Sequence, residues 1–336
     1  MGSATIIQDK ITITIQIKAA FSGSFLYFYR MRNSIFFAGF MLLFISCTST
    51  QKTVQSDKQI SFLLDKPLQT NNSLFWQISG NGLTKPSFLY GTIHIISQED
   101  YFLGKNVLKK LQHSEELIEE IDLNNMNIGE LTKLSVLENG KFIKEYMNDT
   151  DYNILKTFME DTIGIKKFTF ENAYGRFKPF FIEQLIYINY IGQNKESYEE
   201  NFKKIAEDKK IPISGLESFE EQLRFLEDIP IEDQMKSMII TIKNYTRETQ
   251  RLTQLINDYK VQNLNALTAS FEEDEDQITK VKLVDKRNSK WIPKLKTSIQ
   301  NKSCFIAVGA GHLGGENGLI NLLRKQGYTV DPISTN

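Results

Sequence analysis

The distribution of strand-like runs along the chain most constrains its fold. Such runs cluster near the two ends of residues 61–336: "SLFWQIS" (73–79), "SFLYGTIHI" (87–95) and "ELIEEIDL" (116–123) on one side, "CFIAVGAGH" (304–312) and "YTVDPIS" (328–334) on the other. Each group has a stretch with helical spacing of apolar residues between two strands, which is typical of parallel α/β units. The sequence therefore predicts an α/β fold whose mixed sheet is built from N- and C-terminal β-α-β segments.

The middle of the chain has a different pattern. From about residue 125 to residue 300 the apolar spacing is helical, interrupted by one short strand-like run, "IPISGLES" (211–218). Because the cost of closing a long loop grows only logarithmically with its length, such an insertion is compatible with one sheet. We expect a domain over residues 61–336 in which the helical insertion forms a cap.

The first 60 residues are typical of an export signal rather than of a fold. After Met31 and Arg32 an apolar run, 35–45, ends at Cys47, in "FISC". The run is too short to span a bilayer, and the small residues before a cysteine resemble a bacterial lipobox. We expect residues 1–47 to form a signal and lipobox region, with Met31 as a possible true start, and the polar residues 48–60 to form a tether.

This reading places the mature protein in the cell envelope. With a lipid on Cys47 it would be membrane-anchored and face the periplasm or the exterior; with an ordinary cleaved signal it would be secreted. The other cysteine, Cys304, lies in an apolar run and is expected to be a buried thiol, so no internal disulfide would form. A net charge of −1 gives no electrostatic reason to expect a nucleic-acid partner.

Two of the three histidines occur in matching frames. His94 follows Gly91 and His312 follows Gly309, each at the end of a strand-like run. Ligands of open α/β sheets bind at the carboxyl ends of the strands, and a glycine before the imidazole permits a close approach of other groups. If the two strands are neighbours, both imidazoles reach the same rim. The third histidine, His113, ends a helical stretch, where helix-terminal carbonyls account for it.

Carboxylates add to this rim. In "ELIEEIDL" the side chains of Glu120 and Asp122 share one face of the strand, and Glu217 follows another short strand. Two imidazoles and a carboxylate with open positions suit a catalytic divalent metal, which makes a nucleophile of water. The residues predict a metal site formed by His94, His312 and Glu120, with Glu217 as a supporting carboxylate that orients a ligand or acts as a base.

A competing motif is present at the same place. "GAGHLG" (309–314) satisfies G-x-G-x-x-G after a strand, and Asp331 follows about 20 residues later, as in a dinucleotide site. However, in a dinucleotide site the backbone of this motif must come close to the pyrophosphate, and the bulky side chain of His312 would stand in the way. We therefore do not interpret the motif as a nucleotide site.

The order and spacing of several motifs resemble the TraB/PrgY/GumN family, which includes the TIKI proteases. These motifs are "LYGTIHI", "LIEEIDL", "GLESFEEQ", "RNSKW" and "AVGAGHLGGENGLINLLRKQGYTVDPI". The family pattern of two Gly-x-x-His motifs with an acid between them falls on Gly91/His94, Gly309/His312 and Glu120. The resemblance also marks Glu217, Gln222, Arg287 and Asn288 as site residues, and Arg287 is suited to hold a substrate carboxylate.

The resemblance implies a metal-dependent hydrolase that uses manganese, cobalt or zinc. We expect peptidase- or amidase-like activity on a peptide or other small acyl substrate, in the cell envelope. Glu120 would be a metal ligand or the general base. The alternative is a non-catalytic lipoprotein on the same fold that binds or sequesters a peptide.

Overall fold

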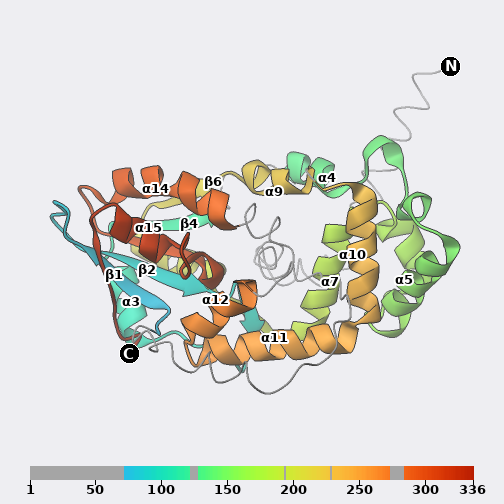
Figure 1. Ribbon diagram of the computed structural model, residues 1–336, viewed down its shortest axis with the longest axis horizontal. Helices are drawn as coiled ribbons and strands as arrows, with labels where there is room; N and C mark the ends of the chain where they lie inside the picture. Colours follow the sequence, from blue (N-terminus) through green and yellow to red (C-terminus); the bar gives the residue numbers. More distant parts are fainter. Residues whose placement is uncertain (1–71, 122–127, 193, 228, 273–283) are drawn as a thin grey trace, which may run out of the picture.

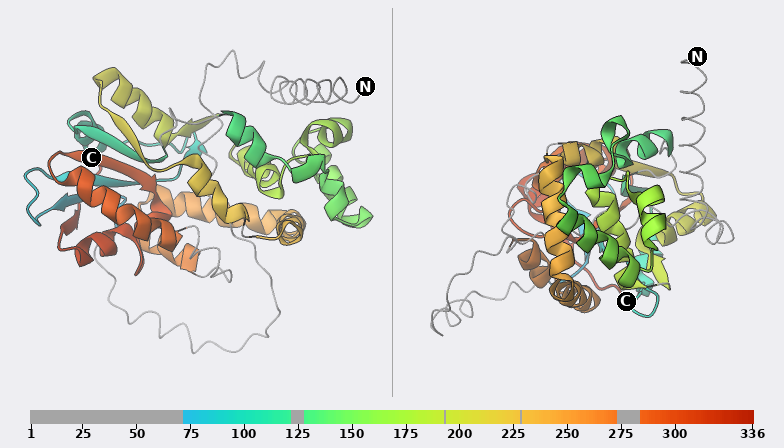
Figure 2. Two further views of the ribbon diagram at one scale, coloured as in Figure 1. Left: turned by 90° about the horizontal axis from the view of Figure 1, so that it is seen from above. Right: turned by 90° about the vertical axis from the view of Figure 1, so that its right-hand side faces the viewer.

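The computed structural model describes residues 72–121, 128–192, 194–227, 229–272 and 284–336. Figure 1 shows a sheet with its flanking helices at one end and a group of helices at the other. Seen from above, the same division is clear, and long helices run between the two ends (Figure 2). Sequence-distant segments therefore build the sheet, as expected from the strand-like runs at both ends of residues 61–336.

The sheet has six strands in the order β6-β4-β7-β2-β1-β8. Strands β2, β4, β6 and β7 run parallel to one another, whereas β1 is antiparallel to both β2 and β8. The bounds are Phe75–Ser79 (β1), Ser87–Thr92 (β2), Glu116–Ile121 (β4), Ile213–Glu217 (β6), Cys304–Gly309 (β7) and Thr329–Pro332 (β8). This is the predicted mixed sheet, with the C-terminal strand β7 inserted between two N-terminal strands.

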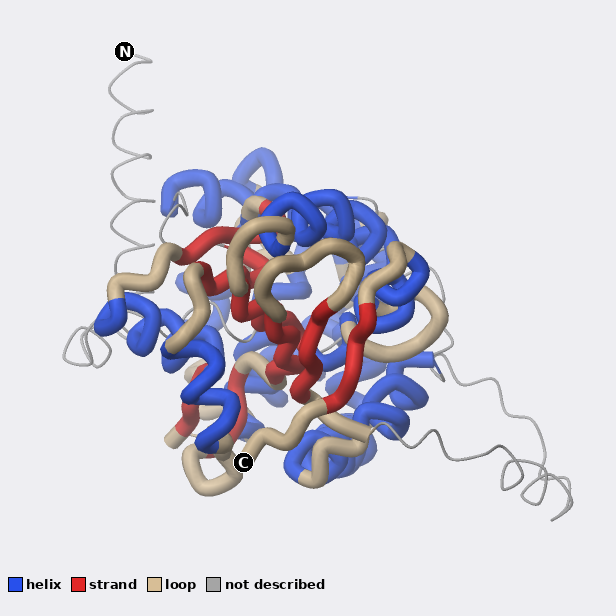
Figure 3. The backbone as a smooth tube through the Cα atoms, turned by 90° about the vertical axis from the view of Figure 1, so that its left-hand side faces the viewer, coloured by secondary structure: helices blue, strands red, loops and turns tan. Residues whose placement is uncertain are grey.

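Both faces of the sheet are covered by helices. Helix α3 (Lys105–Gln112) and helix α8 (Tyr198–Lys209) cover one face, and α14 (Lys286–Ile299) and α15 (Leu319–Lys325) cover the other. Figure 3 shows the strands enclosed between helices. Every residue of β2 and β7 is buried, which is why these strands read as continuous apolar runs rather than as an alternation of apolar and polar residues.

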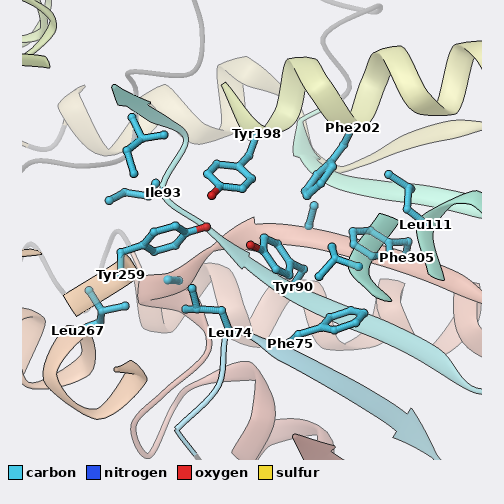
Figure 4. Close-up of a cluster of buried hydrophobic side chains, with 14 of the residues drawn as sticks. Leu74, Phe75, Tyr90, Ile93, Leu111, Tyr198, Phe202, Tyr259, Leu267 and Phe305 are labelled. Carbon is cyan, nitrogen blue, oxygen red and sulfur yellow. The ribbon is translucent and has the colours of Figure 1, made fainter. Parts of the chain in front are cut away.

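Side chains from each strand alternate between two cores. On the α8 side, an aromatic cluster includes Phe75, Tyr90, Tyr198, Phe202 and Phe305 (Figure 4). Ring centroids lie 5.6 Å apart for Tyr90–Phe202 and 5.3 Å apart for Phe202–Phe305, in edge-to-face arrangements. The intervening strand residues pack against α14 and α15. The sheet is therefore a rigid platform, held by apolar burial on both sides.

The remaining helices form the cap and its connections. We define the cap as residues 128–191 and 231–243. Its helices are α4 (Ile128–Ser135), α5 (Asp149–Asp161), α6 (Lys167–Thr169), the π-helical turn Phe170–Tyr174, α7 (Pro179–Ile191) and α10 (Ile231–Lys243). They enclose a core of their own, which includes Leu155, Met159, Ile186 and Met238.

The segment predicted as an insertion also contributes to the sheet body. Strand β6 forms an edge of the sheet, and helices α9 (Phe219–Glu227), α11 (Tyr245–Lys260) and α12 (Leu264–Glu272) link cap and sheet. Tyr245, at the start of α11, packs against the cap core, and Tyr259, near its end, belongs to the aromatic cluster under the sheet. Among the described residues of this segment, the cap is therefore the part that stands away from the sheet (Figure 1).

Two local details differ from the sequence-based expectation. The run 87–95 is not one strand: it breaks after Thr92, and His94 takes a left-handed backbone conformation with φ of +54°. The chain then forms β3 (Ile95–Ser97), which pairs with β5 (Lys195–Ser197) in a separate two-stranded sheet. Strand β5 lies in a part of the insertion that was expected to be helical. Polar three-residue strands such as β5 have no apolar periodicity to reveal them.

Candidate active site

The two Gly-x-x-His frames lie side by side at the carboxyl edge of the sheet. Strands β2 and β7 are parallel neighbours, with Gly91 opposite Val308 and Thr92 opposite Gly309. The chain leaves β2 through a left-handed turn at His94 and leaves β7 through the 3₁₀ turn Ala310–His312. The expectation that both imidazoles reach one rim is confirmed, because the two strands are adjacent.

The glycines of the two frames allow each frame to pack against the other. A Cβ on Gly91 would lie 2.9 Å from Leu313 Cδ2 and 3.1 Å from Ala310 Cα, in the turn that carries the second histidine. A Cβ on Gly309 would lie 3.0 Å from His94 Nε2. The requirement for glycine is therefore steric, since side chains at these positions would push the frames apart.

Both imidazoles face the same carboxylate oxygen. Nε2 of His94 lies 3.8 Å from Glu120 Oε1, and Nε2 of His312 lies 3.9 Å from the same atom. Glu120 is the last residue but one of β4, the strand next to β7, and all three side chains are buried. Residues separated by more than 200 positions in the sequence thus form one cluster.

His94 is oriented by a carboxylate that sequence reasoning did not identify. Glu199, in the first turn of α8, accepts from His94 Nδ1 at 2.6 Å and from Thr92 Oγ1 at 2.7 Å. Burial alone would lower the pKa of His94, but the charge and hydrogen bond of Glu199, with Glu120, raise it above its usual value. A carboxylate behind an imidazole also fixes the Nδ1–H tautomer when Nε2 binds a metal.

His312 is oriented by a neutral amide instead. Its Nδ1 lies 2.7 Å from Asn288 Oδ1, while Asn288 Nδ2 donates to the carbonyls of His312 and Asn317. Burial, together with the positive charge of Arg287, lowers the pKa of His312 to about 3. This imidazole is therefore neutral, with Nε2 directed to the cluster.

Glu120 is held as an anion. Its Oε1 accepts from the backbone N–H of Gly309 at 2.7 Å, and its Oε2 accepts from Arg287 Nη2 at 2.7 Å and Gln222 Nε2 at 3.3 Å. Burial would raise the pKa of this carboxyl, but Arg287 and the two imidazoles outweigh burial and hold its pKa at about 2. A group so acidic acts as a ligand or proton acceptor, not as a proton donor.

Arg287 and Glu217 complete the cluster. Arg287, in the first turn of α14, donates to Glu217 Oε1 through Nε at 2.7 Å and lies 4.7 Å from the centroid of the Trp291 ring. Trp291 Nε1 donates to Glu217 Oε2 at 3.3 Å. Burial raises the pKa of Glu217, although Arg287 opposes this. The predicted role of Arg287 as a holder of a substrate carboxylate stays a prediction, since the guanidinium is engaged within the cluster.

The side chains of His94, His312 and Glu120 are suitable ligands for a divalent cation, but they lie farther apart than the ligands of one bound ion. Within the described part of the chain, no group of three or more His, Cys, Asp or Glu side chains stands close enough to hold a metal ion. Two neutral imidazole nitrogens and a carboxylate oxygen are nevertheless the ligands of catalytic zinc and of related metals. Ligands of one tetrahedral ion lie about 3.4 Å apart, so the cluster would contract by about half an ångström.

The other predicted residues divide into three groups. Gln222, Asn288, Gly91 and Gly309 lie in or beside the cluster. His113 lies at the end of α3, where its Nδ1 is 2.7 Å from the carbonyl of Lys109, and Cys304 is a buried thiol, as expected for both. Asp122 and Cys47 lie outside the described residues.

Comparison with known proteins identifies the family of the chain. The model of the TraB/PrgY/gumN family matches residues 74–332, and the chain belongs to this family. The chain is similar to Metalloprotease TIKI2 of Danio rerio, at 21% identity over 352 residues, covering 86% of this chain and 66% of that protein.

A second relative is the Metalloprotease TIKI homolog of Amphimedon queenslandica, which is 33% identical over 78 residues. That match covers 22% of this chain and 15% of the sponge protein. The chain thus spans less than two thirds of the length of either relative. No solved structure matches it.

Proposed function

We propose that this protein is a metal-dependent hydrolase of peptide or other amide bonds, in which His94, His312 and Glu120 hold the metal. The observation that carries the proposal is the convergence of two imidazole Nε2 atoms on one oxygen of Glu120. The name of the zebrafish relative, a metalloprotease, supports the same reaction class. Manganese, cobalt and zinc are the candidate metals.

A bound divalent metal would supply a water of lowered pKa and polarise the scissile carbonyl. The chain's own residues would then manage protons. Glu120 is ionised and accepts a proton from water at Oε1, or serves as the third ligand. Glu199 holds the Nδ1 proton of His94 and so keeps Nε2 directed at the reacting groups.

The environment of Gln222 favours amides over esters. Its Nε2 donates to Glu120, which fixes the orientation of the amide, and its Oε1 is buried without a hydrogen-bond partner among the described residues. An unsatisfied buried acceptor next to a reactive centre would receive a donor from the substrate. A peptide supplies an N–H beside its carbonyl, whereas an ester does not.

A diverse peptide library tests the reaction. We expect cleavage by wild-type protein loaded with manganese, cobalt or zinc, and loss of cleavage in Glu120→Gln. The control is His113→Ala, which removes the histidine outside the cluster. Cleavage that survives Glu120→Gln, or that needs no metal, would contradict the proposal.

A peptide-binding protein without catalysis is the second candidate. The specific observation in its favour is that Arg287 donates to both Glu120 and His312, so that a protein cation is already in contact with two of the three donor residues. Binding of library peptides without cleavage, by protein that holds no metal after incubation with each ion, would establish this function instead.

We further propose that Cys47 carries a lipid that anchors the protein in the cell envelope, facing the periplasm or the exterior. The basic start, the apolar run and the "FISC" ending support it. In the described residues, no helix is both long enough and apolar enough to cross a membrane. Mass spectrometry of the mature N-terminus would show the modified cysteine, and Cys47→Ala would release the protein from membranes.

A further inference from the structure

The position of Arg287 bears directly on how the cluster could take up a metal. The guanidinium is 8% exposed and uses each of its nitrogens: Nε donates to Glu217, Nη2 bridges Glu120 and Glu217, and Nη1 lies 3.2 Å from His312 Nε2. It therefore contacts two of the three residues assigned as metal ligands. A metal ion and this guanidinium have the same charge sign and seek the same partners.

Because of the tautomer of His312, a metal ion and the Arg287 guanidinium cannot both contact His312 Nε2. Asn288 donates through Nδ2 to two carbonyls, so its Oδ1 is the atom facing His312 Nδ1, and that nitrogen must carry the proton. Nε2 is left with a single lone pair, and Arg287 Nη1, which can only donate, occupies it. A metal can bind His312 Nε2 only after Nη1 has moved away.

The same geometry shows where the guanidinium could go. Arg287 reaches Glu120 through Oε2, whereas both imidazoles face Oε1. Glu217 accepts from Arg287 through Nε and Nη2 and from Trp291 through Nε1. A small rotation that releases His312 would leave the contacts with Glu217 in place.

The charge balance of the cluster leaves room for a second cation. Glu120 and Glu217 are two buried or half-buried carboxylates, and both accept from Arg287. One positive charge does not neutralise two carboxylates, so a divalent ion would still be attracted. Arg287 should therefore weaken metal binding without abolishing it.

We propose that Arg287 is an internal cation that competes with the metal for His312 Nε2, so that metal arrival transfers the guanidinium to Glu217. Arg287 thereby sets the metal affinity and keeps the metal-free cluster folded. This inference rests on the proposed metal site, and it assigns to Arg287 a positioning role rather than direct contact with the reacting atoms.

The test is metal affinity, measured by calorimetry with Mn²⁺, Co²⁺ and Zn²⁺ for Arg287→Met. We expect this variant to bind at least one of the ions tenfold or more tightly than wild type, and its melting temperature to rise more on metal addition. The matched control is Arg324→Met, since Arg324 also stacks on a tryptophan, Trp76, but its two hydrogen bonds go to the carbonyl of Val330. Its affinity should equal that of wild type.

Each other outcome is decisive. Equal or weaker binding by Arg287→Met than by wild type would overturn the competition and leave the metal site standing. No binding by any protein would overturn the proposed function together with this inference. If Arg287→Met does not fold, the double variant Arg287→Met/Glu217→Gln removes the anion left unpaired, and the same tightening is expected from it.

Discussion

The two Gly-x-x-His frames share a motif but not an environment. His94 leaves its strand through a left-handed turn and is backed by a carboxylate, Glu199, whereas His312 lies in a 3₁₀ turn and is backed by an amide, Asn288. Accordingly, the pKa of His94 is raised and that of His312 falls to about 3. Burial lowers the pKa of both histidines; the charge of Glu199 more than offsets this at His94, whereas the charge of Arg287 adds to it at His312.

The largest expected effect comes from removing either imidazole. His94→Ala and His312→Ala should each weaken metal binding by about 100-fold or more, because a site with three protein ligands would lose one of them. Metal content after dialysis measures this directly. His113→Ala, the exposed histidine at the end of α3, should keep its metal. Full metal content in either cluster variant would show that the two frames do not act together.

Exchanging the groups behind the imidazoles tests the difference between the frames. Glu199→Gln should lower the pKa of His94, and Asn288→Asp should raise that of His312, since in each case the charge beside Nδ1 changes. Changing a group that hydrogen-bonds to a metal-binding histidine typically weakens metal binding by roughly 10- to 100-fold, and we expect this of both variants. Imidazole NMR titration of the metal-free variants would follow both residues. Unchanged titration would mean that Glu199 and Asn288 do not set the two pKa values.

Two buried carboxylates also differ in pKa because one has charged partners and the other has none in the described part of the chain. Glu120 is partnered, with a pKa of about 2, whereas burial raises the pKa of Glu183, on α7, to about 8. Glu183 is 5% exposed, and no hydrogen bond or ion pair of its side chain exists among the described residues. Its folded pKa exceeds the unfolded value of 4.5, so the folded state holds the proton more tightly.

Stability should therefore fall as pH rises from 4.5 to about 8, because Glu183 ionises in the unfolded state over this range while the folded state keeps it protonated. Glu183→Gln removes this cost and should be about 2 kcal/mol or more stable than wild type at pH 8, with the difference fading below pH 4.5. Urea unfolding at several pH values measures it. Parallel stability curves for the two proteins would contradict the assignment.

The glycines give the smallest expected effect. Gly91→Ala places a methyl group against Ala310 and Leu313 and should lower the free energy of unfolding by about 1–3 kcal/mol. Gly309→Ala places it against the His94 ring nitrogen, so metal affinity should fall along with stability. Equal effects on metal binding would show that the two frames are interchangeable.

Much of this site followed from the sequence because strands buried on both faces are continuous apolar runs. The apolar runs of β2 and β7 were therefore visible, and with them His94 and His312, whereas the alternation of side chains along β4 indicated Glu120. The family pattern added Arg287 and Asn288, which lie in the same cluster.

The structure revealed features that depend on contacts between segments far apart in the sequence. Glu199 lies on a helix in the middle of the chain, and only the pairing of β3 with β5 brings it to His94. The sequence did carry one usable signal, because Ser197 followed by Glu200 is a helix-start pattern, and Ser197 indeed caps α8. The left-handed turn at His94 had no such signal, since a β-rich run continues through it.

The most direct test of the whole account is anomalous diffraction from crystals grown with Mn²⁺ or Zn²⁺. We predict one strong peak within bonding distance, about 2.0–2.2 Å, of His94 Nε2, His312 Nε2 and Glu120, with Arg287 turned toward Glu217. A peak elsewhere, or Arg287 still on His312 in crystals saturated with metal, would contradict it.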